Sequence, residues 1–480
     1  MGVAFCLLFV WWFVSGIFMM YWDYPSVSDA DRLERAPFLD GSEVKLSPEE
    51  AWAKVDDSDQ EPRSARLAVF EGRPAYEFRY GFNSAHTVYA DTGEPREFFA
   101  QEMRLRTAAE WTRQPASAAR VELLQEPDQW TLEGDFRRLF PLSKYSWPSG
   151  EQVYVDSANE VVQFTTRSSR FFAELGPIPH WLYYTPLRKN GPLWSKVVIW
   201  LSGIATVAAV MGLIVGLTMY SPSRRISIPY KGQKRLHHIL GLFFGTVACT
   251  WAFSGMLSME PFPLSSGRPP QGRSIAAALR GKRPQLSQYA PRPPQEVLAE
   301  LGPAFQVKEL ELSSFASEPV YVATGARGET RVIRMRGDPL VSFDTNRILN
   351  VVMSVANVAE SRLIPQYDAY YLDRTRQRPL PVLFVQLNDE THSRYYIDPK
   401  TAQVVGAYRS STQSWVNRWL YHGLHSINFP WLYNYRPAWD IVVLMLMLGG
   451  TSLCLTSVII GFQLVRRKLF LRRTTSGASL

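Results

Sequence analysis

The chain contains 480 residues, of which 46% are hydrophobic and 20% are charged, and its formal net charge is +8 at pH 7. A chain of this length forms more than one domain. Its positive surplus does not indicate a nucleic-acid partner, because many basic residues lie beside long apolar stretches, where membrane lipid attracts them. All three cysteines lie inside those stretches. The polar segments therefore have no disulfides, and no C-x-x-C-H motif offers covalent haem attachment.

The first apolar stretch is repeated within the chain. Residues 1–20, MGVAFCLLFVWWFVSGIFMM, reappear in pattern as residues 240–259, LGLFFGTVACTWAFSGMLSM, and both copies contain Trp-x-x-Ser-Gly. This repeat indicates a duplicated membrane unit. His237 and His238 precede the second copy, whereas the equivalent positions of the first copy lie before Met1. We therefore expect an upstream extension that carries a histidine. A signal peptide is the alternative, but the stretch lacks a basic n-region and a small-residue cleavage site.

Four apolar stretches, at roughly 2–22, 197–220, 239–259 and 441–464, are long enough to cross a membrane core of about 30 Å. Basic residues after the second and fourth stretches place those ends in the cytoplasm. These residues are Arg224, Arg225, Lys231, Lys234 and Arg235 in the loop, and Arg466, Arg467, Lys468, Arg472 and Arg473 in the tail. We predict membrane helices at 1–22, 191–220, 237–259 and 436–464, exported domains at 23–190 and 260–435, a cytoplasmic loop at 221–236 and a cytoplasmic tail at 465–480.

Each exported segment is predicted to be an α+β unit. In the first segment, 46–55 is a helix, and 75–81, 86–95 and 151–166 contain strands. In the second segment, 292–301 is a helix, and 319–325, 330–337, 381–387 and 393–408 contain strands. Tyr154-Val155-Asp156 corresponds to Tyr396-Ile397-Asp398. Residues 261–294 are rich in Pro, Gly, Ser and Arg, which predicts a flexible connection.

Several of these motifs together resemble the PepSY-associated transmembrane family. They are YVDSANEVVQFTT at 154–166, KRLHHILGLFFG at 234–245 and NRWLYHGLHSINFPWLYNYRPAWD at 417–440. The resemblance covers essentially the whole chain, and the short first span departs from it. It implies two exported PepSY-like domains and a place among bacterial inner-membrane proteins of iron acquisition, which include haem-containing ferric-siderophore reductases with four spans.

Five of the seven histidines lie at predicted membrane edges: His180, His237, His238, His422 and His425. A single histidine at such an edge is more often a headgroup contact, but a set of five favours a cofactor role. His422 and His425 share one predicted helical turn, and Arg418 lies one turn earlier, where it could neutralise a haem propionate. Trp181-Leu182-Tyr183 matches Trp419-Leu420-Tyr421, so His180 and His422 belong to corresponding regions.

On the third span, His237, Gly241 and Gly245 share one face, and the glycines could form a groove for a flat macrocycle. A small-residue contact between helices is the alternative.

These patterns predict haem b bound by pairs of neutral imidazoles, an arrangement suited to electron transfer. One haem would use His237 or His238 with the absent first-span histidine. A second would use His180 with His422 or His425. No H-E-x-x-H zinc motif competes.

The favoured function is reduction of a ferric complex, such as a ferric siderophore, in the periplasm, because ferrous iron binds hard oxygen ligands less well. No side chain is predicted to be catalytic. No G-x-G-x-x-G motif follows a strand, so the electrons would come from a quinol or a separate donor protein. The alternative is a non-enzymatic PepSY membrane protein that binds peptides or modulates an exported protease or an iron-uptake partner. A siderophore transporter fits less well, because the spans lack broken, charged helices.

Overall fold

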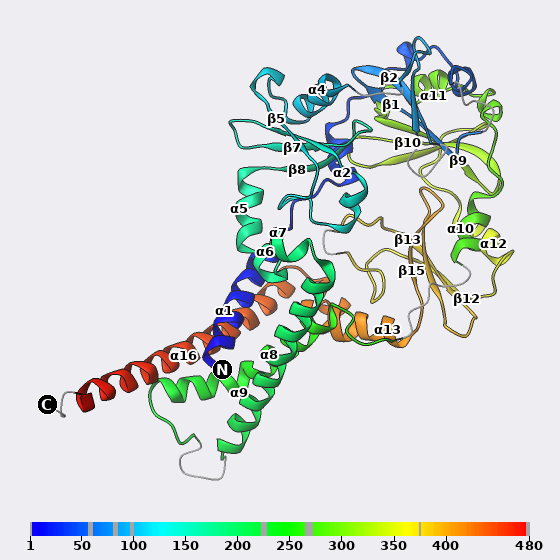
Figure 1. The fold of residues 1–480 in the computed structure, drawn as a ribbon. Helices are drawn as coiled ribbons and strands as arrows, with labels where there is room; N and C mark the ends of the chain where they lie inside the picture. Colours follow the sequence, from blue (N-terminus) through cyan, green and yellow to red (C-terminus); the bar gives the residue numbers. More distant parts are fainter. Residues whose placement is uncertain are drawn as a thin grey trace.

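The computed structural model describes residues 2–55, 61–79, 85–96, 100–221, 228–264, 272–373 and 376–476. Its apolar helices lie together at one end of the molecule, and its antiparallel sheets lie at the other (Figure 1). The protein is therefore of mixed α and β class, as the sequence predicts.

Three helices are long and apolar enough to cross a membrane. They are α8 (Gly191–Met219), α9 (Gln233–Leu257) and the part of α16 (Ala438–Ser476) that ends at Arg467. A fourth apolar helix, α1 (Gly2–Met19), is shorter. All four lie within a few residues of the predicted spans. Helix α1 packs along α16, and α9 packs along both α8 and α16.

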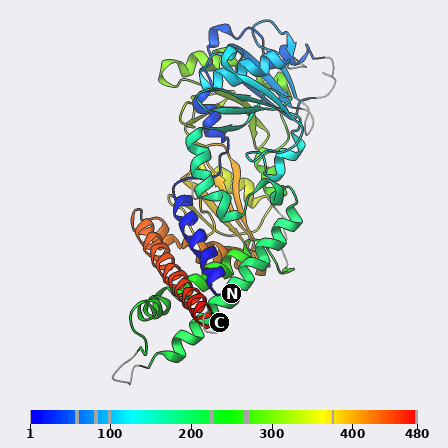
Figure 2. The same ribbon diagram turned by 60° about the vertical axis from the view of Figure 1, so that its left-hand side comes forward.

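The helix ends that carry the basic residues lie away from the sheets. Both views place the start of α1, the end of α16, the end of α8 and the start of α9 at this far end (Figures 1 and 2). Lys231, Lys234 and Arg235 are exposed there, whereas Arg224 and Arg225 lie outside the described residues. Both large polar segments therefore lie at the opposite end from the basic residues, an arrangement compatible with the predicted topology.

Two adjacent glycines of α16 let neighbouring helices approach closely. A Cβ on Gly449 would overlap the ring of Phe244 from α9, and a Cβ on Gly450 would lie 2.6 Å from the ring of Phe13 from α1. Small residues at such contacts are typical of membrane helices, which associate through close packing.

The largest sheet has seven strands in the order β11-β10-β9-β1-β2-β3-β4. The first segment supplies β1 (Ser64–Phe70), β2 (Arg73–Arg79), β3 (Ala85–Tyr89) and β4 (Pro95–Arg96). The second supplies β9 (Glu309–Phe315), β10 (Glu318–Thr324) and β11 (Thr330–Arg334). Because β1 pairs with β9, the two segments share one sheet rather than forming two separate domains as predicted.

The shared sheet repeats the same unit about its centre. Strands β1, β2 and β3 have the same lengths and spacing along the chain as β9, β10 and β11. One face buries Leu67 and Tyr76 of the first unit with Leu310 and Tyr321 of the second in a single core. Helices α3 (Pro48–Trp52) and α11 (Pro294–Leu301) contribute to this core from equivalent positions before the strands. Both confirm predicted helices.

Each segment also forms a four-stranded sheet of its own. The first contains β5 (Arg120–Leu124), β6 (Leu142–Ser146), β7 (Gln152–Val155) and β8 (Val161–Thr165). The second contains β12 (Val358–Ile364), β13 (Val382–Leu387), β14 (Arg394–Asp398) and β15 (Gln403–Tyr408). The predicted correspondence of the two hairpins agrees with their contacts. Tyr154 donates to Asp128 at 2.8 Å, and Tyr396 donates to Asp368 at 2.9 Å.

The predicted flexible connection at 261–294 is wrong for much of its length. Helix α10 (Gly272–Arg280) lies within it, and Ile275 and Leu279 are buried in the core beside the second small sheet. Apolar residues spaced four apart gave this stretch a buried helical face despite its Gly and Arg content. Residues 265–271 lie outside the described residues.

The remaining helices outside the apolar group cover the sheets or lead into the apolar helices. They are α2 (Asp29–Arg35), α4 (Gln101–Thr112), α5 (Arg167–Leu175), α6 (Pro177–Trp181), α7 (Thr185–Arg188), α12 (Thr345–Met353), α13 (Thr412–Trp415), the π-helix Val416–Gly423, α14 (Leu424–Ser426) and α15 (Pro430–Tyr433).

Replacing Gly449 by Ala should lower the thermal midpoint of the detergent-purified protein. The added methyl group collides with Phe244, and overpacking of this kind costs about 1–3 kcal/mol. Gly212→Ala is the matched control, because a Cβ on Gly212 meets no atom within 4 Å. Equal thermal midpoints for the two variants would contradict the packing of α9 against α16.

Candidate functional site

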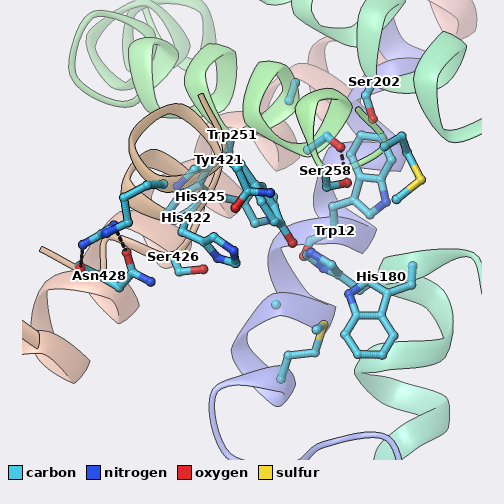
Figure 3. A pocket seen from close by; sticks show the side chains of 18 of the residues that line it. Trp12, His180, Ser202, Trp251, Ser258, Tyr421, His422, His425, Ser426 and Asn428 are labelled. Atoms are coloured by element: carbon cyan, nitrogen blue, oxygen red, sulfur yellow. Dashed lines mark hydrogen bonds between the residues drawn. The ribbon is translucent and has the colours of Figure 1, made fainter. Parts of the chain in front are cut away.

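A cavity of about 960 Å³ lies where the apolar helices meet the short helices that precede α8 and α16. Its volume is at the upper end of the range for small-molecule and cofactor sites, about 300–1,000 Å³. Helices α1, α9 and α16 supply residues to its wall, and so do α6, the π-helix and α14 (Figure 3). Aromatic side chains line much of it, among them Trp12, Trp181, Trp194, Trp251, Tyr370, Tyr408 and Tyr421.

His180 of α6 is held against α1 by its Nδ1 atom. This atom lies 3.1 Å from Ser15 Oγ and 3.1 Å from the carbonyl oxygen of Trp12. A Cβ on Gly16 would lie 3.5 Å from His180 Cε1, an ordinary van der Waals distance, so the imidazole packs directly against α1 at this residue. The Trp-x-x-Ser-Gly sequence of α1 therefore positions one cavity histidine.

His425 of α14 makes the equivalent contacts with α9. Its Nδ1 lies 3.0 Å from Ser254 Oγ, and a Cβ on Gly255 would lie 3.5 Å from its Cε1. Trp251 Nε1 donates to the carbonyl oxygen of Leu424 at 2.7 Å and so fixes the neighbouring backbone. Both copies of the repeated Trp-x-x-Ser-Gly sequence thus position one histidine each.

The two imidazoles face each other across the cavity. Their ring centroids are 5.9 Å apart, and their planes are inclined at 69°. When two imidazoles bind one metal ion through Nε2, each Nε2 atom lies about 2 Å from the ion. The two ring centroids are then roughly 6 Å apart. Since Nδ1 of each ring is engaged by its helix, Nε2 is the nitrogen left for a metal. The spacing and the donor set fit a shared ion.

Both histidines are neutral at pH 7. Burial lowers the pKa of His180 from 6.5 to about 4 and the pKa of His425 from 6.5 to about 3. The neutral imidazole is the form that binds metals.

Arg418 and His422 both lie in the π-helix, a rare form that is frequent at functional sites. Arg418 is buried, and its guanidinium donates to Ala369 O, to Asn428 Oδ1 at 2.9 Å and to Asn428 O at 3.0 Å. These acceptors are uncharged, so a positive charge remains on the cavity wall. His422 also lines the cavity, and burial and Arg418 lower its pKa. The structure pairs His180 with His425 rather than with His422.

The structure also changes the predicted correspondence of the two pre-span regions. Trp194 Nε1 donates to Trp181 O at 2.8 Å, and Trp439 Nε1 donates to Ser426 O at 3.1 Å. Trp181 therefore corresponds to Ser426, and His180 to His425. The matching Trp-Leu-Tyr triplets predicted the wrong correspondence, because a short local sequence similarity does not determine which residues contact the following helix.

The predicted residues of the third span lie apart from this cavity. His237 Nδ1 is 2.9 Å from Thr456 Oγ1 of α16, whereas His238 is buried beside Tyr230. A Cβ on Gly245 would lie 2.7 Å from Leu213 of α8, and one on Gly241 would lie 3.8 Å from Leu453. Leucine side chains therefore occupy the predicted glycine groove, and Gly245 is a helix contact.

Within the described residues, no group of three or more His, Cys, Asp or Glu side chains is arranged to hold a metal ion. The His180–His425 pair would thus need a metal whose other ligands come with it. Ser15, Ser254 and Thr456 were not predicted as site residues, although the repeated Ser-Gly dipeptide was a visible signal for the first two.

Neither a protein-family model, nor a curated protein, nor a solved structure matches the chain.

Acid should destabilise the purified, cofactor-free protein through His180 and His425. Because burial depresses their folded-state pKa values, the unfolded chain binds protons below its ordinary pKa that the folded chain excludes. We expect the thermal midpoint to fall as the pH drops from about 6.5 towards 4.

The double variant His180→Gln/His425→Gln should show a shallower pH dependence over that range. His392→Gln serves as the control, because His392 is exposed. A pH dependence of the double variant as steep as that of the parent protein would contradict burial of the two neutral imidazoles.

Proposed function

We propose that the protein is a haem-bearing membrane oxidoreductase that passes electrons outward to a ferric complex, such as a ferric siderophore. The observation that carries this proposal is the His180–His425 pair, one histidine from each half of the chain, set 5.9 Å apart across a large aromatic cavity.

The donor set favours haem b over a bare metal ion. A structural zinc site takes four protein ligands, whereas a porphyrin supplies four of its iron's six ligands and leaves two axial positions for protein. Two facing neutral imidazoles meet that requirement. When bound, such a haem accepts and donates single electrons. Aromatic walls would exclude water from its faces, and the positive charge of Arg418, whose side-chain acceptor Asn428 is uncharged, suits a propionate.

Transfer across the membrane calls for a second cofactor, because a core of about 30 Å is too wide for a single hop. His237 is the residue we assign to it. This histidine lies near the basic end of α9, and its Nδ1 is held by Thr456 in the same manner as the cavity histidines. The equivalent Trp194 and Trp439 contacts support a duplicated arrangement of all four helices.

The exposed basic residues at the far ends of the helices support placement of those ends in the cytoplasm. The sheets would then lie in the periplasm of a bacterium, with the apolar helices in the inner membrane. We assign the two repeated α+β segments to the PepSY class that the sequence resembles.

The chain's own residues bind and orient the cofactor and move no proton in this scheme. The electrons would come from a separate donor protein or from a quinol, which is oxidised to a quinone, releases two protons and gives up two electrons one at a time. Each electron converts one Fe³⁺ in an external complex to Fe²⁺. Ferrous iron is softer and is held less tightly by catecholate or hydroxamate oxygens, so the carrier is released intact.

Absorption spectra of the detergent-purified protein, oxidised and dithionite-reduced, test the proposal. The parent protein should show sharp reduced bands and a pyridine haemochrome of haem b. His180→Ala and His425→Ala should each lower haem occupancy of the cavity by about tenfold or more, because each removes one axial ligand.

His422→Ala is the matched control. His422 lines the same cavity three residues before His425 but does not face His180, so its removal should leave the low-spin spectrum intact. A colourless parent protein would contradict the proposal and favour a non-enzymatic PepSY protein that binds peptides or modulates a partner. Loss of haem only in His422→Ala would contradict the assigned pair.

A further inference from the structure

Three histidines, on three different elements, meet the same local arrangement. In each case the hydroxyl of a Ser or Thr on an apolar helix lies against Nδ1, at 3.1 Å for His180, 3.0 Å for His425 and 2.9 Å for His237. The hydroxyls belong to Ser15 of α1, Ser254 of α9 and Thr456 of α16.

Each hydroxyl also donates to its own helix. Ser15 Oγ donates to Trp12 O at 3.1 Å, Ser254 Oγ to Trp251 O at 3.2 Å and Thr456 Oγ1 to Leu453 O at 2.7 Å. A hydroxyl has one proton, and here the carbonyl three residues earlier receives it. While its proton lies on that carbonyl, the hydroxyl oxygen acts towards the histidine as an acceptor.

The same carbonyls approach the histidines. Trp12 O lies 3.1 Å from Nδ1 of His180, and Leu453 O lies 3.3 Å from Nδ1 of His237. A carbonyl oxygen has no proton to give, so Nδ1 must carry the hydrogen in both contacts. A neutral imidazole with its proton on Nδ1 has its lone pair on Nε2.

We propose that Ser15, Ser254 and Thr456 are positioning residues that, together with the backbone of their own helices, hold His180, His425 and His237 in the Nδ1–H tautomer and so leave Nε2 free to bind iron. This inference rests on the proposed haem function. A hydrogen bond donated by Nδ1 makes the imidazole a more basic ligand, which favours ferric over ferrous iron.

The arrangement is distinct from ordinary back-bonding of Ser and Thr in helices. Ser258 Oγ donates to Gly255 O at 2.6 Å and lines the same cavity, and Thr451 Oγ1 donates to Met447 O at 2.8 Å on α16. Neither hydroxyl contacts a histidine nitrogen in the described part of the chain. The three positioning residues therefore differ from Ser258 and Thr451 in that the hydroxyl of each contacts a histidine imidazole.

The first test needs no haem. Nitrogen-15 NMR of the full chain, purified without haem and labelled only at histidine, reports which ring nitrogen carries the proton. Signals assigned to His180, His425 and His237 by single His→Gln variants should show a protonated Nδ1. Ser15→Ala should shift the Nδ1 signal of His180, because one of its two acceptors is lost while the carbonyl of Trp12 keeps the proton on Nδ1, and should leave His425 unchanged. Ser254→Ala should shift the Nδ1 signal of His425 and leave His180 unchanged.

Ser258→Ala and Thr451→Val are the controls and should leave all three histidines unchanged. A proton on Nε2 in any of the three, or no response to Ser15→Ala and Ser254→Ala, would overturn the inference. Because this readout is independent of haem, a colourless protein whose histidines carry Nδ1–H would refute the proposed function and leave the tautomer assignment standing.

The second test is a redox titration of the haem-loaded protein, followed by absorption. Ser15→Ala and Ser254→Ala should each raise the midpoint potential of the cavity haem, because each removes an acceptor that makes the axial ligand more basic. Loss of such a hydrogen-bond partner typically changes metal affinity by at least about tenfold. A tenfold change in the affinity for ferric relative to ferrous iron equals about 59 mV for one electron. Haem content should stay near that of the parent protein. Midpoint potentials equal to that of Ser258→Ala would overturn the inference while the haem function stood.

Discussion

The cavity exists only because the two halves of the chain are held face to face. Each half supplies one histidine of the pair, and neither half alone encloses the site. The antiparallel pairing of β1 with β9 joins the halves in a single sheet, and burial of Leu67 with Leu310 in one core makes separation costly. The apolar helices also join the halves, because α1 packs along α16 and α8 packs along α9. Within each half, α1 brings Ser15 to His180 and α9 brings Ser254 to His425.

Much of the local structure could be predicted from the sequence. The apolar helices followed from length and composition, and strands such as β7 and β14 followed from alternating residues before a turn. The central strands β1 and β9 were missed. Their outward residues are charged, and Arg66 is stabilised only once Glu77 and Glu309 lie beside it, at 2.5 Å and 3.3 Å. Such a pairing between distant segments leaves no local signal in the sequence.

The sequence predicted which histidines belong to the site, but it did not predict which two of them face each other. All of the candidate histidines could be found from their clustering near the spans, yet the choice between His422 and His425 depended on which imidazole contacts α9. The repeated Trp-x-x-Ser-Gly sequence indicated duplication, but only the contacts of Ser15 and Ser254 show that each copy positions a histidine. The glycine groove failed as a prediction because spacing on one helix does not reveal that Leu213 of the neighbouring helix fills it.

In the proposed function, His180 and His425 would hold one iron between them. Cryo-electron microscopy of the purified full chain would show whether they do. We expect a flat macrocycle in the cavity, with Nε2 of both histidines about 2 Å from its centre and Nδ1 of each beside its serine. A cavity without such a group in a coloured protein, or a macrocycle held by His422 while His425 stands apart, would contradict it.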